Sequence, residues 1–292
     1  MTARHSLHLS HDGSTTAKDL ADGAPSTLDL SAVEPDLAAS AAVGKAGAAL
    51  IIARSAAQTQ ALYLKEPGDT AAISVNDINQ GQMGDCFLLS AIGELALWHP
   101  DAITNMIHVN RNGSETVTLY MASNGQRPYF NTSAYKPSYV TVTNDFPSNS
   151  VNSWEGQDVV GNQKEIWPQV IEKAFATENG GYAGIAYGGF PVVAMEELTG
   201  HMATAMRSSS FTVAALQADI AAGDLIVMNT AYSANLPYNL VPGHAYMFEK
   251  LVASSGGPMV QLGNPWGFNQ PALIPFAQLS NGISEVDVGR VH

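Results

Sequence analysis

The stretch that decides the fold is GQMGDCFLLSAIGELALW, residues 81–98, in which a glycine-punctuated loop leads into a long apolar segment. From Asp85 onward, apolar residues occupy almost every face of a helical projection, which is typical of a helix in the centre of a core. Gly84 and Asp85 stand where a turn and an N-cap are expected. We therefore predict a buried helix that begins at Cys86.

Cys86 is the only cysteine of the chain, so an internal disulfide is excluded. At the first turn of a helix, backbone N–H groups without intrahelical partners and the helix macrodipole favour a thiolate over a thiol. The thiolate is the nucleophilic form of cysteine. The position of Cys86 therefore predicts an activated sulfur.

The remaining pattern changes from helical to extended along the chain. Apolar stripes that end at glycine or asparagine predict further helices over 168–177, 193–198 and 213–222. Short apolar or alternating runs then predict strands over 225–229, 244–251 and 259–262. This order predicts an α+β fold in which a mainly helical lobe, residues 66–208, precedes a mainly antiparallel β lobe, residues 209–292. We expect the functional site in the cleft between the lobes.

Residues 1–65 have a different composition, first rich in Ser, Thr, Asp and Gly and then dense in Ala. Alanine favours helix, so we expect a partly helical or disordered leader, pro-segment or targeting region. The N-terminus lacks the basic start and apolar core of a signal peptide, and no apolar run is long enough to cross a bilayer. These features predict a cytoplasmic protein, with signal-independent export left open.

The composition of the 292 residues fits a globular protein, with 46% hydrophobic and 13% charged residues. A net charge of −13, with only 13 Lys and Arg, argues against a nucleic-acid partner, because phosphate binding depends on basic side chains. The sequence contains no CxxC or HExxH pattern, which argues against a zinc site.

Two further polar motifs accompany the loop before Cys86. His244 stands at the start of a predicted strand, and Asn264 follows the end of the next one. Two adjacent antiparallel strands would make these residues neighbours, so that the Asn264 oxygen fixes the imidazole tautomer and the other ring nitrogen faces sulfur. The order Cys, His, Asn, with a wide separation, is that of papain-like cysteine proteases.

Four segments together resemble the protease core of the calpain family of cysteine proteases. They are QGQMGDC at 80–86, EIWPQVIEKAF at 165–175, GHAY at 243–246 and NPWG at 264–267. The family has a tryptophan after the cysteine, where this chain has Phe87. The resemblance spans roughly residues 75–268, and it implies a core-only relative, without the C2-like and EF-hand domains of typical animal calpains.

The resemblance implies a role for each matched residue. Cys86, His244 and Asn264 would form the catalytic triad, and Gln80 would donate to the oxyanion together with the Cys86 backbone N–H. Trp266 would shield the His–Asn hydrogen bond from water. The implied reaction is hydrolysis of peptide bonds in proteins or peptides through a thioester acyl-enzyme.

The resemblance also implies calcium as a cofactor. Asp77 and Glu165 match the acidic positions of a first site in the family core, and carboxylates are the hard ligands that Ca²⁺ requires. A second site is not expected, because Gln270 and Ala277 occupy positions where acids are needed.

The leading prediction is a calcium-dependent cysteine endopeptidase. Two alternatives remain open at this point, which are a transglutaminase-like Cys/His acyltransferase and a catalytically silent binding module on the same fold. The four polar residues Gln80, Cys86, His244 and Asn264 are all present, which argues against the silent module.

Overall fold

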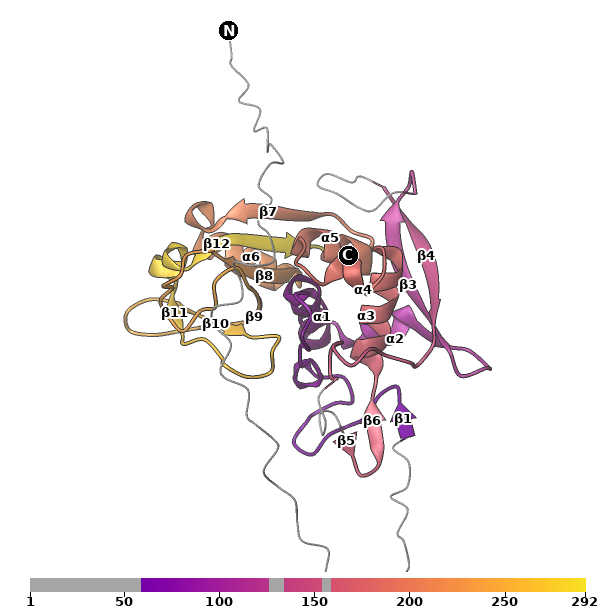
Figure 1. Cartoon of the computed structure of the whole chain (residues 1–292). Helices are drawn as coiled ribbons and strands as arrows, with labels where there is room; N and C mark the ends of the chain where they lie inside the picture. Colours follow the sequence, from indigo (N-terminus) through magenta and orange to yellow (C-terminus); the bar gives the residue numbers. More distant parts are fainter. Residues whose placement is uncertain (1–58, 126–133, 154–158) are drawn as a thin grey trace, which may run out of the picture. The chain divides into compact units, whose positions relative to one another are not determined.

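The computed structural model describes residues 59–125, 134–153 and 159–292, which combine helices with three β-sheets (Figure 1). The α+β class predicted from the sequence is therefore confirmed. Most of the predicted leader, up to residue 58, lies outside the described residues. No helix in the described ranges has the length and apolar character that a membrane span requires.

The four predicted helices are found close to their predicted positions, and two short helices, over 100–106 and 182–185, were not predicted. Their bounds are α1 Cys86–Trp98, α2 Pro100–Met106, α3 Trp167–Glu178, α4 Tyr182–Ile185, α5 Pro191–Thr199 and α6 Val213–Ala222. Short 3₁₀ helices add η1 Val75–Asp77, η2 Ser208–Ser210 and η3 Phe276–Asn281. Gly200 and Gly223 end α5 and α6 in the left-handed conformation, at φ 72° and 73°, which a residue without a Cβ adopts at low cost.

A six-stranded sheet dominates the C-terminal part of the chain. Its strand order is β11-β10-β9-β8-β12-β7, and every pairing is antiparallel. The bounds are β7 Ala203–Arg207, β8 Leu225–Thr230, β9 Ala245–Val252, β10 Met259–Gly263, β11 Ile274–Pro275 and β12 Ile283–Gly289. The predicted strands over 225–229, 244–251 and 259–262 are thus confirmed. The sheet begins at β7, slightly before the predicted lobe boundary at residue 209.

The N-terminal part is less helical than the sequence analysis predicted. It contains an antiparallel sheet of β2 Ile107–Val109, β3 Glu115–Ala122 and β4 Tyr135–Val142, and a smaller sheet of β1 Thr59–Ala61, β6 Gln163–Glu165 and β5 Val159–Val160. The signal for β3 was present in the sequence, because Val117, Leu119 and Met121 alternate with Thr and Tyr residues. Helices α2, α3 and α5 pack against β3, so this sheet and the helices share one core.

Helix α1 lies between the six-stranded sheet and the other helices (Figure 1). It contacts β8 and β9 on one side and α2, α3 and α5 on the others, which explains why ten of its residues are buried. The Ser90 hydroxyl donates to the Ala245 carbonyl at 3.0 Å and joins the helix to β9. The apolar helix predicted from its all-round hydrophobicity is confirmed.

A second core covers the opposite face of the six-stranded sheet. It contains Ile226 and Met228 of β8, Tyr246 and Phe248 of β9, and Leu216 of α6. Side chains of alternate residues along β8 and β9 therefore enter two different cores. Both faces of the central strands are covered, which holds the start of β9 in a fixed position.

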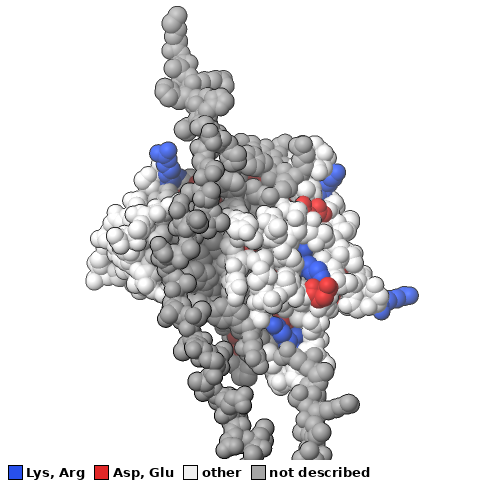
Figure 2. All heavy atoms as spheres, in the orientation of Figure 1, with Lys and Arg blue, Asp and Glu red and all other residues white. Residues whose placement is uncertain are grey.

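Many acidic side chains of the described residues are inside the protein. Nine of them are buried: Asp77, Asp85, Glu94, Glu115, Glu165, Glu172, Glu196, Glu197 and Asp287. Consistent with this, the face drawn in Figure 2 displays few charged side chains among the described residues. Burial favours the neutral form of a carboxyl group, so the sequence charge of −13 overstates the surface charge.

We expect Glu94→Ala to lower the free energy of unfolding by about 1–3 kcal/mol, because it leaves a buried backbone donor without an acceptor. Glu94 is fully buried in α1, and its Oε2 accepts from the Ile226 N–H of β8 at 3.0 Å. Denaturant unfolding at neutral pH measures the change. Glu94→Gln keeps an acceptor at this position and should retain most of the stability; equal losses in the two variants would contradict this account.

Burial raises the pKa of Glu94 well above its ordinary 4.5. Its contribution to stability is therefore complete below pH 4.5 and is lost as the pH rises through the raised pKa. The uncharged Glu94→Gln variant should show a weaker decline in stability toward alkaline pH than the wild type.

Candidate active site

Cys86 is the first residue of α1, as predicted, and its side chain is only partly buried. Burial raises the pKa of its thiol above the ordinary 9.0, and the nearby Asp85 carboxylate raises it further. Backbone N–H groups of Ala245, Phe87 and Cys86 itself lower the pKa, as expected at a helix N-terminus. The increase in the thiol pKa caused by burial exceeds the decrease caused by these donors, so this structure favours the thiol over the predicted thiolate.

His244 immediately precedes β9 and is buried. Its backbone N–H donates to the Thr230 hydroxyl at 2.8 Å, and its carbonyl accepts from the Thr230 N–H at 2.9 Å. These bonds fix the residue at the end of β8. Burial lowers the pKa of the imidazole below 6.5, against the opposite effect of the hydrogen bond with Asn264. The neutral imidazole therefore predominates at neutral pH.

Asn264 follows β10 and lies beside His244, because β9 and β10 are antiparallel neighbours. The His244 Nε2 and the Asn264 Oδ1 are 2.9 Å apart. The Asn264 amide is oriented by two further bonds: its Nδ2 donates to the Asn269 carbonyl at 3.1 Å, and its Oδ1 accepts from the Trp266 N–H at 3.1 Å. An acceptor therefore faces the ring, so Nε2 carries the proton and Nδ1 is left unprotonated.

Two other residues support this pair. The Trp266 ring lies 4.8 Å from the His244 ring, centroid to centroid, and the Tyr246 ring lies at the same centroid distance, with its plane at 90° to the imidazole. Gln270, one of the two residues that led us to expect no second calcium site, has a structural role: its Oε1 accepts from the Asn264 N–H at 2.7 Å.

Gln80 is buried in the loop before α1. Its backbone N–H donates to the Pro265 carbonyl at 2.8 Å, which joins the loop to the segment that follows Asn264. Its side-chain Nε2 donates to the Met83 carbonyl at 2.6 Å, and this bond directs the amide within the loop. Gln80 and His244 line the same pocket as Cys86.

Asp85 stands at the N-cap position of α1 but does not cap it, which corrects the expectation from the sequence. Its carboxyl group is fully buried and interacts with Gln80 and with the equally buried Glu172 of α3. Burial raises the pKa of Asp85 to about 6, and burial together with the Asp85 charge raises the pKa of Glu172 well above its usual range. Two adjacent carboxyl groups in an apolar setting favour the sharing of one proton.

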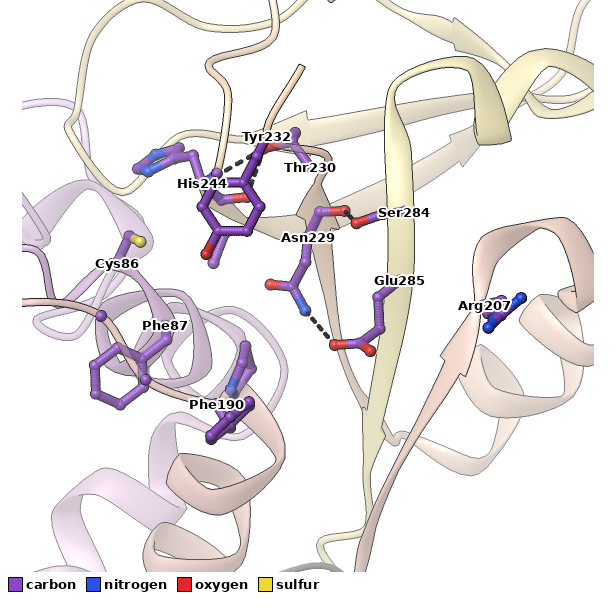
Figure 3. A pocket seen from close by; sticks show the side chains of 15 residues that line it. Cys86, Phe87, Phe190, Arg207, Asn229, Thr230, Tyr232, His244, Ser284 and Glu285 are labelled. Carbon is purple, nitrogen blue, oxygen red and sulfur yellow. Dashed lines mark hydrogen bonds between the residues drawn. The ribbon is translucent and has the colours of Figure 1, made fainter. Parts of the chain in front are cut away.

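Cys86 and His244 both line two pockets, of about 420 and 450 Å³. The second holds Gln80 and Trp266. The first, shown in Figure 3, begins at Cys86 and His244 and reaches β8 and β12. Sequence analysis assigned no role to several residues of these walls, and nothing in their spacing marked them: Tyr187, Gly188, Gly189, Phe190, Tyr232 and Glu285.

The two predicted calcium ligands lie on different segments, since Asp77 ends η1, three residues before Gln80, whereas Glu165 ends β6. Asp77 is buried and forms one group with Glu66 and Asp69, in which carboxylate oxygens lie within 4.8 Å of one another. Its Oδ2 accepts from the Ser74 N–H at 2.7 Å and the Trp167 indole N–H at 3.0 Å. Glu165 is not in this group, and its Oε1 accepts from the Leu64 N–H at 2.6 Å.

This acidic group fits a hard cation in its chemistry. Burial raises the pKa of Asp77 to about 7, and the charges of Glu66 and Asp69 add to the increase. Carboxylates held close together, with no ion pair to a basic side chain in the part of the chain that the structure describes, are the kind of ligand set that Ca²⁺ takes.

Comparison with known proteins shows which family the chain resembles. A model of the calpain family cysteine protease domain matches residues 67–272. The chain is 28% identical over 210 residues to the calpain-2 catalytic subunit of Macaca fascicularis and 27% identical over 208 residues to calpain-9 of Homo sapiens. Each alignment covers 65% of this chain and 28% of the relative, so the chain spans less than a third of the length of these relatives.

We expect Gly81→Ala to lower the free energy of unfolding by about 1–3 kcal/mol, because the loop next to Gln80 has no room for a methyl group. A Cβ on Gly81 would lie 2.1 Å from the Ser150 carbonyl oxygen and 2.4 Å from that of Asn149. Denaturant unfolding checks the change. Gly256→Ala is the control, since its Cβ would meet nothing closer than 3.9 Å. Equal unfolding midpoints for the two variants would contradict the close approach of the Ser150 and Asn149 carbonyl groups to Gly81.

Proposed function

Because the chain belongs to the calpain family of cysteine proteases, we propose that it hydrolyses peptide bonds through the triad Cys86, His244 and Asn264. The observation that carries the proposal is the 2.9 Å contact between His244 Nε2 and Asn264 Oδ1, on a histidine that shares two pockets with the only cysteine. The substrates are proteins or peptides, as the family implies.

The reaction starts from a neutral thiol and a neutral imidazole. As the Cys86 sulfur attacks the substrate carbonyl, its proton passes to His244 Nδ1. The resulting imidazolium then donates that proton to the leaving amine, which departs as the thioester forms. In the second half, His244 Nδ1 takes a proton from water as the water oxygen attacks the thioester carbon. The C–S bond then breaks, the carboxylic acid product leaves, and the proton passes from His244 to the Cys86 sulfur. Asn264 holds Nε2–H throughout, so the same nitrogen serves as base and acid.

Gln80 is the second group of the proposed site. Its amide nitrogen and the Cys86 backbone N–H, at the start of α1, would donate to the negative oxygen of the tetrahedral intermediate. The loop that carries Gln80 is attached to the segment after Asn264 through the Pro265 carbonyl, which supports a fixed geometry between the donor and the triad. Trp266 would keep water from the His244–Asn264 bond, consistent with its ring contact.

In this proposal residues 66–292 are the catalytic domain, and its site lies in a cleft between the 66–208 part that carries Cys86 and the 209–292 part that carries His244 and Asn264. The two pockets on either side of the Cys86–His244 pair support such a cleft, since each is lined from both parts. Residues 1–65 act as a leader or pro-segment. The protease would act in the cytoplasm, with signal-independent export as the alternative route.

Calcium is the proposed cofactor, and Asp77 and Glu165 are its candidate ligands. The acidic group adds Glu66 and Asp69 as further oxygen donors. Asp77 lies three residues before Gln80, and its Oδ2 accepts from the Trp167 indole at the start of α3. A bound cation would supply positive charge that neutralises these carboxylates, and the loop from Asp77 to Gln80 would then be held against α3.

We expect the purified chain to cleave casein, and Gln80→Ala to lower kcat/KM roughly 10²–10³-fold through loss of one oxyanion donor. Cys86→Ala should abolish cleavage and the alkylation of the protein by iodoacetamide, because it removes the only thiol. Gln217→Ala, on an exposed position of α6, should match the wild type. Mass spectrometry of the products distinguishes the two reactions. New peptide termini support hydrolysis, whereas cross-linked or amidated glutamines would contradict it and support acyl transfer.

We expect terbium, used in place of calcium, to luminesce on excitation of tryptophan, because the Trp167 indole contacts Asp77 at 3.0 Å. Calcium should displace terbium and raise the melting temperature of the wild type. Asp77→Asn should remove both signals and Glu165→Gln should weaken them. Glu178→Gln, at the other end of α3 from Trp167, serves as the control. Full signals in Asp77→Asn would refute the site.

A further inference from the structure

The pocket in Figure 3 continues from the reacting residues to a polar end. One wall near Cys86 is formed by Gly188, Gly189 and Phe190, and the opposite end is formed by Asn229 of β8 and by Ser284 and Glu285 of β12. The volume, about 420 Å³, is within the range of pockets that hold a small ligand or a long side chain. A peptide bound across Cys86 would therefore place a neighbouring side chain in this pocket.

Two carboxyl groups lie close together at the polar end. The Asn229 amide donates to the Glu285 carboxylate at 3.3 Å and to the Asp287 carboxylate at 2.8 Å. Asp287 is fully buried, and burial together with the Glu285 charge raises the pKa of its carboxyl group well above the usual range. Glu285 is only partly buried, and its carboxyl group is the one of the two that lines the pocket.

A basic residue stands beside Glu285 without forming an ion pair with it. Arg207 of β7 is the register partner of Glu285 and lines the same pocket. Among the described residues no ion pair within 4.0 Å joins the two, and Figure 3 draws the Arg207 side chain apart from the Glu285 carboxylate. Arg207 itself is exposed. The Glu285 carboxylate is thus available to a cation from outside the chain.

We propose that this pocket binds a Lys or Arg side chain of the substrate close to the scissile bond, with Glu285 as the specificity-determining residue. The inference rests on the proposed protease function. The carboxylate would accept charge-assisted hydrogen bonds from the ammonium or guanidinium group. The apolar stem of the same side chain would pack on Phe190, whose ring is half exposed, and the aromatic wall suits a cation.

The test is digestion of a proteome-derived peptide library, with mass spectrometry of the residues on both sides of each cleaved bond. The wild type should enrich Lys and Arg at one position. For a peptide pair that differs only by Arg or norleucine there, the ratio of kcat/KM values should fall roughly 10- to 100-fold in Glu285→Gln. Glu249→Gln, a partly buried glutamate of the same sheet outside the pocket, should keep the wild-type ratio.

Other outcomes overturn the inference. An unchanged ratio in Glu285→Gln removes the assigned role of this residue. Enrichment of Asp or Glu that disappears in Arg207→Gln means that the pocket recognises an acidic side chain instead. If the wild type cleaves no peptide, the proposed function fails on its own, and binding still tests the pocket. The Cys86→Ala protein should then bind fluorescein-labelled Arg peptides more tightly than their norleucine counterparts, and Cys86→Ala/Glu285→Gln should bind the two equally.

Discussion

The hydrogen bond between His244 Nε2 and Asn264 Oδ1 is the interaction on which the rest of the site depends. It exists because β9 and β10 are antiparallel neighbours, so that a residue before one strand lies beside a residue after the other. The Asn269 carbonyl and the Trp266 N–H fix the amide, and the amide in turn fixes the tautomer of the ring. A base with its free nitrogen at Nδ1 follows from these bonds alone.

The placement of sulfur has a different cause. Helix α1 is apolar on almost every face, so it is stable only between the six-stranded sheet and the other helices. The bonds of Ser90 to Ala245 and of Glu94 to Ile226 hold it against β9 and β8, and thus set the start of the helix near His244. The same burial that positions the groups keeps both neutral, since it raises the pKa of the Cys86 thiol and lowers that of the imidazole. Proton transfer would then accompany attack, rather than precede it.

The sequence predicted those parts of the fold in which local pattern and tertiary environment agree. The all-round apolar helix α1 and the alternating strand β9 carry such patterns, and the motif strings around Cys86, His244 and Asn264 named the candidate site. The predictions failed where a residue had two possible partners. Asp85 was expected to cap a helix, but its carboxyl group is buried with Glu172. A thiolate was expected from the helix N-terminus, but burial raises the pKa of the Cys86 thiol, and a short stretch of sequence does not show burial. The proposed role of Glu285 depends on a pocket assembled from six separate segments, so it had no signal in the chain itself.

Nitrogen NMR of histidine in the ¹⁵N-labelled protein tests the central claim most directly. The His244 ring is identified among the eight histidines by its loss in a His244→Gln variant. At neutral pH we expect a neutral ring with the proton on Nε2, an unprotonated Nδ1 and a pKa below 6.5. In Asn264→Ala the two tautomers should become mixed. A ring protonated on both nitrogens at neutral pH, or a proton held on Nδ1 in the wild type, would contradict the account.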